Sequence, residues 1–279
     1  MNNIIHDFMV EEHIKSALKE DIGFGDITTD FITDENDKLS AQLMTREDGI
    51  LCGYKIFVNV FKILDPNISI KFYFVDGDRI KAGDKIADIT GSARYILNGE
   101  RVALNYIQRM SGIATETNKY VLALKDYKAK ITDTRKTTPN FRLFEKYAVK
   151  VGGATLHRYN LSDCAMIKDN HIRYAGSITK AVERLKQNIS HTHKIEVECD
   201  TLEQVQEALE CKADIIMLDN MSTQAMEYAC QIIKDKAIIE ASGNIKLDTI
   251  KKIAECGVDI ISSSAIVAKA KTLDLALDI

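Results

Sequence analysis

The sequence predicts an α/β protein in two parts, an N-terminal α+β cap and a C-terminal domain built like an α/β barrel. Two observations carry this prediction. From residue 41 to residue 89, short β-prone runs alternate with tight turns, whereas beyond about residue 100 a long helix is followed by short apolar strands that alternate with helical stretches. The second pattern recurs roughly every 20–25 residues, which implies parallel strands joined by crossover helices. We expect fewer than eight complete strand–helix units.

The composition supports a globular enzyme-sized chain. Its 279 residues are 46% hydrophobic, enough for a large core, and 37 Lys and Arg face 41 Asp and Glu. An acidic chain repels nucleic acid. No apolar run approaches the roughly 20 residues that span a bilayer, and residues 1–7 lack the charged start and apolar stretch of a secretory signal. The six cysteines are scattered, so we expect reduced thiols in a cytoplasmic protein.

The N-terminal domain is expected over residues 1–109. An amphipathic helix is predicted at 11–20, followed by a glycine-containing loop at 21–29. From 41 to 89 the pattern indicates strands and tight turns. The alternating tail at 271–279 is predicted to return to this domain as a strand.

The C-terminal domain is expected over residues 110–270. A long helix is predicted at 101–115. The strands predicted after it are 129–132, 165–167, 194–198, 215–218, 238–241 and 260–262, and the helices among them are 202–211, 221–234 and 247–256.

Polar side chains follow these strands at the point where each one ends. The segment 132–135 comes at the end of one strand, and Lys168, Glu198, Asp219 and Ser242 stand at or just past the ends of others. The carboxyl ends of parallel barrel strands form the rim on which active sites are built. The sequence therefore predicts a site at this rim.

A cationic group of side chains on an acidic chain predicts a small anionic ligand. Arginine binds carboxylate or phosphate through two hydrogen bonds, and lysine acts as a point charge. Arg135, Lys136, His157, Arg158 and Lys168 together suit a ligand with two carboxylates, or a pyrophosphate. The alternatives are a solvated surface lysine at Lys136 and an ordinary ion pair at Arg158.

Two further groups of rim residues suggest what else binds. Glu198 and Asp219 offer carboxylates that could hold Mg²⁺, stabilise an oxocarbenium ion or act as general acid and base, unless each only pairs with a neighbouring lysine. Two segments of small hydroxyl and glycine residues follow the last two strands, where barrels bind phosphate. Their residues are Ser242, Gly243, Asn244, Ser262, Ser263 and Ser264.

Nine phrases along the chain resemble the quinolinate phosphoribosyltransferase family, also called nicotinate-nucleotide pyrophosphorylase (carboxylating). They are residues 20–29, 99–105, 108–115, 133–139, 145–149, 167–172, 196–198, 217–220 and 240–243. Their order and spacing are specific, and they run nearly from end to end. The resemblance implies an α/β sandwich-like domain over an open, incomplete TIM-like barrel.

The resemblance also implies an activity. Quinolinate and phosphoribosyl pyrophosphate (PRPP) would give nicotinate mononucleotide, pyrophosphate and CO₂, the step by which de novo NAD synthesis makes its first pyridine nucleotide. It implies Mg²⁺ and a homodimer with shared active sites, to which Arg101 would contribute across the interface.

Individual roles follow from the same resemblance. Arg135, His157, Arg158 and Lys168 would bind the quinolinate carboxylates, and Lys136 would face the phosphates. Glu198 and Asp219 would contact the ribose hydroxyls and Mg²⁺ and act as catalytic residues with Lys136. The serine and glycine segments at 242–244 and 262–264 would hold the 5′-phosphate.

The chain departs from the family pattern at four places. Ala154 stands where a third glycine is usual, Asn244 and Ser264 stand where the phosphate segments usually have glycine, and Val267-Ala268 replaces Thr-His. These departures leave two alternatives: a paralogous phosphoribosyltransferase of the group associated with molybdenum transport, or a non-catalytic phosphosugar-binding protein.

Overall fold

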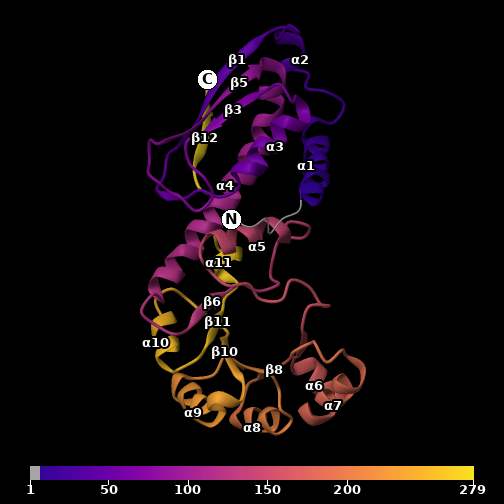
Figure 1. The fold of residues 1–279 in the computed structure, drawn as a ribbon, viewed down its shortest axis with the longest axis vertical. Helices are drawn as coiled ribbons and strands as arrows, with labels where there is room; N and C mark the ends of the chain where they lie inside the picture. The colour runs from indigo at the N-terminus through magenta and orange to yellow at the C-terminus, as the bar shows by residue number, and fades with distance from the viewer. Residues whose placement is uncertain (1–6) are drawn as a thin grey trace. The chain divides into compact units, whose positions relative to one another are not determined.

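The computed structural model describes residues 7–279. Most of the segment 1–7, which lacks the features of a secretory signal, therefore lies outside the described residues. The chain folds as two compact units (Figure 1). The first comprises residues up to Asn118 together with Asn140–Gly153 and Ala270–Ile279, and the second comprises Lys119–Pro139 and Ala154–Lys269. The first unit thus includes residues 110–118 and 140–153, which were expected in the C-terminal domain.

The first unit contains a four-stranded antiparallel sheet in the order β12-β1-β5-β3. The strands are β1 (Lys38–Thr45), β3 (Ser69–Phe72), β5 (Lys85–Ser92) and β12 (Leu275–Asp278). A short pair, β2 (Gly49–Ile50) with β4 (Arg79–Ile80), lies beside the turns at Gly77 and Gly83. The C-terminal tail pairs with β1, with Leu277 opposite Leu43.

Among the described residues, from 7 onward, five helices belong wholly or mainly to this unit. They are α1 (Asp7–Ile22), α2 (Thr29–Ile32), α3 (Tyr54–Leu64), α4 (Ala93–Ala123) and α5 (Arg142–Val151). The predicted helices at 11–20 and 101–115 are confirmed and are longer than expected.

The prediction of strands and turns throughout 41–89 is wrong at α3. The segment is rich in β-branched and aromatic residues, which favour strands in isolation. Its buried side chains nevertheless recur at helical spacing, with Ile56 and Phe57 one turn before Val60 and Phe61. Packing of this apolar stripe overrides the local strand preference.

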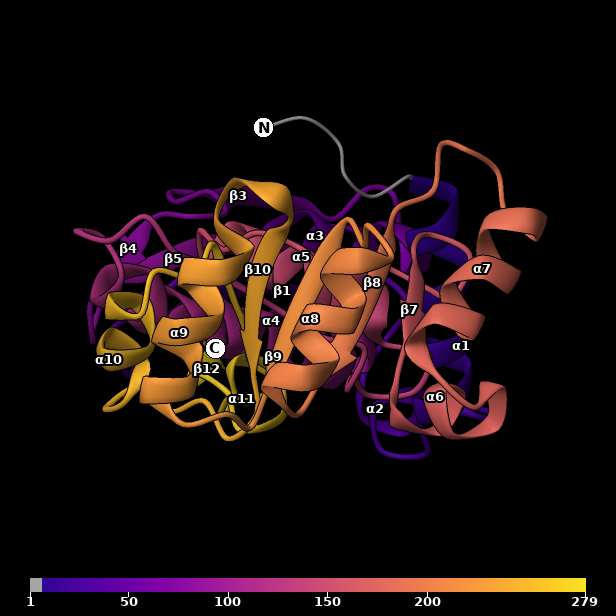
Figure 2. The same ribbon diagram turned by 90° about the horizontal axis from the view of Figure 1, so that it is seen from below.

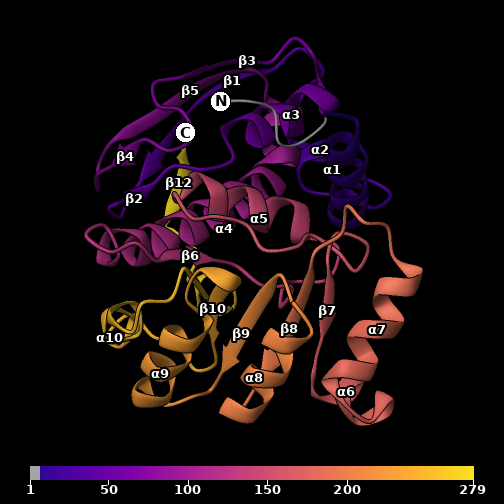
Figure 3. The same cartoon turned by 60° about the horizontal axis from the view of Figure 1, so that its bottom comes forward.

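The second unit contains six parallel strands in the order β6-β11-β10-β9-β8-β7 (Figure 3). They are β6 (Lys130–Thr132), β7 (Ala165–Ile167), β8 (Ile195–Cys199), β9 (Ile215–Asp219), β10 (Ile238–Ser242) and β11 (Ile260–Ser262). All six predicted strands are confirmed. Their near-continuous apolar sequences are typical of parallel strands that are covered on both faces.

Helices accompany this sheet, with α7, α8 and α9 along one side of it (Figure 2). The helices of the unit are α6 (Asp169–Ala175), α7 (Ile178–Asn188), α8 (Leu202–Glu210), α9 (Thr223–Ile233), the 3₁₀ turn η1 (Lys234–Lys236), α10 (Ile250–Glu255) and α11 (Ala265–Ala268). Ser177, Thr201 and Ser222 cap α7, α8 and α9, each accepting a backbone N–H with its side chain. Such a cap contributes about 1 kcal/mol and fixes where each helix begins after its strand.

The barrel is incomplete. Beyond β6, the strand-like residue Thr155 forms one parallel bridge with Thr132, and its N–H donates to the oxygen of Ile131 at 3.0 Å. Within residues 7–279, no ladder joins this edge to β7, so the predicted open barrel is confirmed. None of the described helices is long and apolar enough to cross a membrane.

Candidate functional site

One edge of the parallel sheet carries the polar residues predicted for the site. Paired residues of neighbouring parallel strands point to the same face, and side chains alternate along each strand. Glu198 of β8 pairs with Met217 of β9, and Asp219, two residues further on, pairs with Ser242 of β10. Glu198, Asp219 and Ser242 therefore share one face at the carboxyl ends of three adjacent strands, where barrel sites form.

A polar pocket of about 400 Å³ lies at this edge. It brings together eight of the predicted residues: Lys136, Asp219, Ser242, Gly243, Asn244, Ser262, Ser263 and Ser264. Thr134, which also lines the pocket, belongs to the rim segment 132–135 that the sequence predicted. The remaining lining residues were not selected from the sequence as site residues; they are Asn220, Ile245, Lys246, Ala265 and Lys269. Lys246 and Lys269 add to Lys136, so the pocket has three cationic side chains over hydroxyl-rich loops and suits a phosphate.

Two asparagines shape the floor of this pocket. Asn244 adopts the left-handed region, with φ 50°, and Asn220 does so with φ 54°. The Nδ2 of Asn244 donates to the Oδ1 of Asn220 at 3.0 Å, and the Nδ2 of Asn220 donates to the Oδ2 of Asp219 at 2.8 Å. Asparagine tolerates this backbone region better than most residues. Asn244 thus keeps the loop shape of the usual glycine and links the loop to Asp219. Ser264 has an ordinary φ of −75° and does not need glycine's freedom.

Replacement of Gly243 by alanine is expected to weaken PRPP binding. Gly243 has φ +96°, and an added Cβ would meet the backbone nitrogen of Asn220 at 2.8 Å and the side chain of Asn220 more closely still. Displacement of Asn220 should raise the PRPP KM about tenfold or more. Steady-state kinetics and thermal unfolding measure this.

Gly257→Ala is the matched control. Gly257 has nearly the same φ, +95°, but its added Cβ would only touch the Cβ of Cys230 at 3.8 Å. Both variants should lose about 1–2 kcal/mol from the left-handed backbone, and only Gly243→Ala should change the PRPP KM. Equal KM values in the two variants would contradict a role for Gly243 in the pocket.

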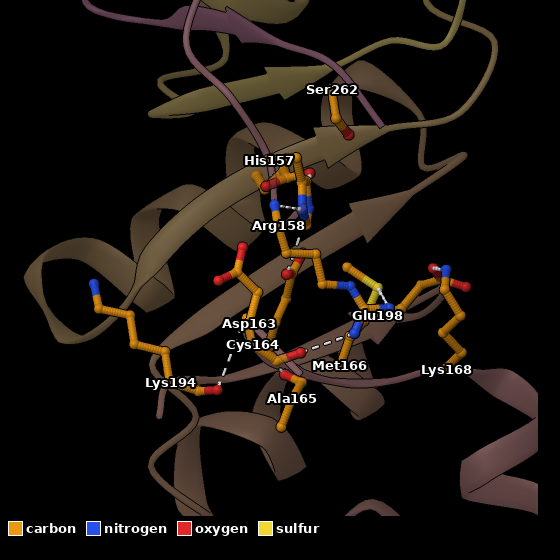
Figure 4. Close-up of polar contacts among 12 residues, drawn as sticks. His157, Arg158, Asp163, Cys164, Ala165, Met166, Lys168, Lys194, Glu198 and Ser262 are labelled. Carbon is orange, nitrogen blue, oxygen red and sulfur yellow. Dashed lines mark hydrogen bonds and ion pairs between the residues drawn. The ribbon is translucent and has the colours of Figure 1, made fainter. Parts of the chain in front are cut away.

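Cationic side chains lie along the neighbouring strand ends (Figure 4). Lys168, directly after β7, forms an ion pair with Glu198. The guanidinium of Arg158 donates to the oxygen of Cys164 at 2.8 Å and lies 3.6 Å from the sulfur of Met166. Arg158 also lines a mainly apolar groove of about 800 Å³ beside β7. Lys168 is not among the residues that line this groove. An arginine and a lysine at neighbouring strand ends suit an anion with two carboxylates.

His157 lies against two buried glutamates that sequence analysis did not select. Its Nε2 is 3.5 Å from the Oε2 of Glu196 and 3.4 Å from the Oε1 of Glu240. The side chains of Glu196 and Glu240 are only 1% and 5% exposed. Glu196 lies two residues before Glu198, and Glu240 lies two residues before Ser242. Because side chains two apart along a strand point to the same face, this spacing places both glutamates on the face of the sheet that carries the site.

The protonation of this cluster differs from that of separate groups. Burial lowers the pKa of His157, but the hydrogen bonds and charges of Glu196 and Glu240 outweigh it and raise that pKa to about 10. Burial raises the pKa of Glu196, and the neighbouring Glu240 adds to this. The raised pKa values of His157 and Glu196 favour an added proton on this pair at neutral pH, and because Nδ1 of His157 accepts the N–H of Arg158, that proton lies between Nε2 and the carboxylate.

The remaining predicted residues are placed less specifically. Arg135 is half-buried just after β6, and Lys136 is exposed, with its N–H donating to the Oγ1 of Thr134 at 3.0 Å. Arg101 is exposed on α4 in the first unit, so it is not among the residues that the second unit gathers.

The second unit thus defines a class of protein. An open parallel α/β barrel has at its carboxyl rim a polar pocket with hydroxyl groups and three lysines, and beside it two carboxylates, an arginine and a further lysine. These groups suit an enzyme that joins a phosphosugar to an anionic acceptor.

Comparison with known proteins places the chain within that class. Residues 26–111 match the model of the N-terminal domain of quinolinate phosphoribosyl transferase, and residues 113–278 match its C-terminal domain. The chain belongs to the quinolinate phosphoribosyltransferase family.

Individual relatives agree along nearly the whole chain. A Synechocystis sp. protein named "Probable nicotinate-nucleotide pyrophosphorylase (carboxylating)" is 43% identical over 97% of this chain and 92% of its own. The crystal structure of NadC from Streptococcus pyogenes has a TM-score of 0.95 at 42% identity, covering 99% of this chain and 97% of that one. The nicotinate-nucleotide pyrophosphorylase from Francisella tularensis has a TM-score of 0.94 at 42% identity, with 99% and 98% covered.

Proposed function

We propose that this chain transfers the phosphoribosyl group of PRPP to quinolinate with decarboxylation. The products are nicotinate mononucleotide, pyrophosphate and CO₂, which makes the reaction a step of de novo NAD biosynthesis. Family membership over both domains supports this, and one structural observation carries it. The same sheet edge presents Asp219 in a phosphate pocket and Glu198 in contact with the cationic Lys168.

The two substrates divide the site by charge. Quinolinate is a planar pyridine with adjacent carboxylates, and Arg135, His157, Arg158 and Lys168 are proposed to bind it. The hydroxyl-rich pocket with Lys136 is proposed to hold the 5′-phosphate of PRPP and part of its pyrophosphate. Lys168 would connect the two halves, because its ammonium group already contacts Glu198.

The chemistry requires no protein nucleophile. Departure of pyrophosphate from C1 of the ribose leaves an oxocarbenium-like centre, and Glu198 and Asp219 stabilise its positive charge. The pyridine nitrogen forms the new bond to C1 and becomes cationic. The C–CO₂⁻ bond at ring carbon 2 then breaks, the pyridinium ring retains the electron pair, and a proton from solvent replaces the lost CO₂.

The acidic pair fits Mg²⁺ in its donor chemistry, because both residues supply carboxylate oxygens and Mg²⁺ prefers oxygen ligands. Among the described residues, the one group of three or more candidate ligands is His157 with Glu196 and Glu240, not Glu198 and Asp219. Two carboxylates alone make a weak site, so we propose that the ion is held jointly by Glu198, Asp219 and the oxygens of PRPP. When bound, it would neutralise the charge of the leaving pyrophosphate.

A homodimer is proposed, with Arg101 reaching the partner's quinolinate site. Arg101 is exposed on α4 of the first unit. The same unit exposes four large apolar side chains in and around α2, namely Phe24, Ile27, Phe31 and Ile32, at 72% or more of their surface. An apolar group of this kind on one segment is typical of an association surface. A cytoplasmic location is proposed as well, and it agrees with six free cysteines.

The direct test of this function is product formation. We expect the purified protein with quinolinate, PRPP and Mg²⁺ to release equal amounts of nicotinate mononucleotide, pyrophosphate and CO₂, and a chelator to abolish the reaction. Absence of product at saturating substrates would contradict the proposal and favour a phosphosugar-binding protein. Product from nicotinate but not from quinolinate would indicate a paralogous phosphoribosyltransferase.

A further inference from the structure

A buried ionic cluster lies one layer beneath the proposed substrate site. Glu196 precedes Glu198 by two residues on β8, and Glu240 precedes Ser242 by two on β10. Both carboxylates are almost fully buried, and three of their four oxygens lack a conventional hydrogen bond. Buried carboxylates are costly to the fold unless something compensates them. Their proximity to His157 indicates that they act on this residue.

Both ring nitrogens of His157 are engaged, and they differ in role. The backbone N–H of Arg158 donates to Nδ1 at 2.7 Å, and the backbone N–H of His157 donates to the buried Oδ1 of Asp133 at 2.8 Å. A nitrogen that accepts an N–H holds a lone pair, so the ring proton is on Nε2. Nε2 faces Glu196 and Glu240. The glutamates thus select the tautomer that leaves Nδ1 available to the main chain.

The position of Arg158 follows from this ring. Its main chain is held by Nδ1 of His157, and its guanidinium is held by the oxygen of Cys164 and the sulfur of Met166 (Figure 4). A rotation of the ring would release the first of these contacts and move the point from which the side chain projects. Displacement of a binding group by about 1 Å can cost roughly 100-fold in an enzyme.

We propose that Glu196 and Glu240 are positioning residues for quinolinate binding, which act through His157 to fix Arg158. This inference rests on the function proposed above and adds two residues to it. A metal ion in the cluster is the competing interpretation, since the three candidate ligand atoms lie within 4.8 Å of one another. The geometry disfavours it, because a metal on Nε2 would move the ring proton to Nδ1, which already accepts the N–H of Arg158.

Two substitutions of Glu240 test the proposal. Glu240→Leu removes one of the two carboxylates that face Nε2 of His157, and we expect it to raise the quinolinate KM about tenfold or more while the PRPP KM and kcat stay within about threefold. Glu240→Gln keeps a carbonyl acceptor at the same place and should retain most of the affinity. Glu196→Leu and Glu196→Gln should behave in the same way, and they replace the first pair if Glu240→Leu does not fold.

Glu207→Leu is the control for loss of stability. Glu207 accepts the N–H and the hydroxyl of Thr179, each at 2.8 Å, in the helical layer of the same unit. Its replacement should lower the unfolding temperature and leave the quinolinate KM unchanged. Equal rises of the quinolinate and PRPP KM in Glu240→Leu, or Glu240→Gln as damaging as Glu240→Leu, would overturn the proposal.

A double-mutant cycle and a spectrum complete the test. In a His157→Ala background, Glu240→Leu should have no further effect on the quinolinate KM, and fully additive effects would overturn the proposal.

In ¹⁵N spectra of the wild-type protein, His157 should show one protonated and one bare nitrogen at neutral pH, and two protonated nitrogens would overturn it. The spectrum needs no substrate, so a failure of this inference is distinguishable from a failure of the proposed activity.

Discussion

Replacing Glu198 with glutamine is expected to lower kcat by about 100-fold or more. The amide keeps the shape of the side chain but loses the negative charge that we propose stabilises the developing oxocarbenium ion, and removal of one such electrostatic group costs about 10²–10³ in rate. Lys168 loses its anionic partner in the same variant, so a smaller change in the quinolinate KM should accompany the fall in kcat. Steady-state kinetics with each substrate varied in turn measures both.

Asp259→Asn provides the matched control. Asp259 also pairs with a lysine, Lys128, at 2.7 Å, but it stands directly before β11, at the amino ends of the strands. Bases and acids at that end of a barrel serve stability rather than catalysis. We expect an unchanged kcat in Asp259→Asn, and an unchanged kcat in Glu198→Gln would remove Glu198 from the reacting centre.

The second large effect is expected from mixing two variants that are impaired in quinolinate binding, assayed at quinolinate concentrations well below their raised KM. Arg101→Ala and Arg158→Ala should each raise the quinolinate KM by about 100-fold, since each would delete the charge-assisted hydrogen bond to a carboxylate that we propose for that arginine. If Arg101 acts in the partner's site, a mixed dimer contains one intact site and one doubly damaged site. Unfolded and refolded together, the two variants should therefore recover up to about a quarter of the wild-type activity.

The controls for mixing are the two variants refolded alone and a mixture with matched concentrations left unexchanged. Neither should regain activity. Failure of the exchanged mixture, with subunit exchange verified by a mass tag, would place Arg101 outside the partner's site. A monomer by analytical ultracentrifugation would contradict the shared site altogether.

The barrel strands were predictable from sequence because burial on both faces leaves a plain signature. Short apolar runs such as 215–218, separated from one another by helical stretches, are typical of buried parallel strands. The rim residues were predictable for the same reason, since a polar side chain directly after such a run must stand at its carboxyl end. That inference placed Asp219 and Ser242 at the same rim, and the register of β9 and β10 then shows that they are paired.

The parts that sequence did not predict depend on contacts distant along the chain. The helix α3 has a strand-like composition and becomes helical only where its apolar stripe packs. Glu196 was not selected because an acidic residue in a strand is ordinarily expected at a surface, and only the fold shows it buried against His157. Lys269 is far in sequence from the other pocket residues, and nothing local marks it as one of them.

Side chains along β8 alternate between the two faces of the sheet. Glu196 and Glu198 face the site, whereas Val197 and Cys199, both fully buried, point to the helical side. Deleting or inserting a single residue within the strand would exchange the two sets, so that both carboxylates would enter the apolar layer and two apolar side chains would face the substrates. Insertions and deletions in this enzyme can therefore accumulate in its loops. Within a strand that carries site residues, a change of one residue in length would turn those residues to the opposite face of the sheet.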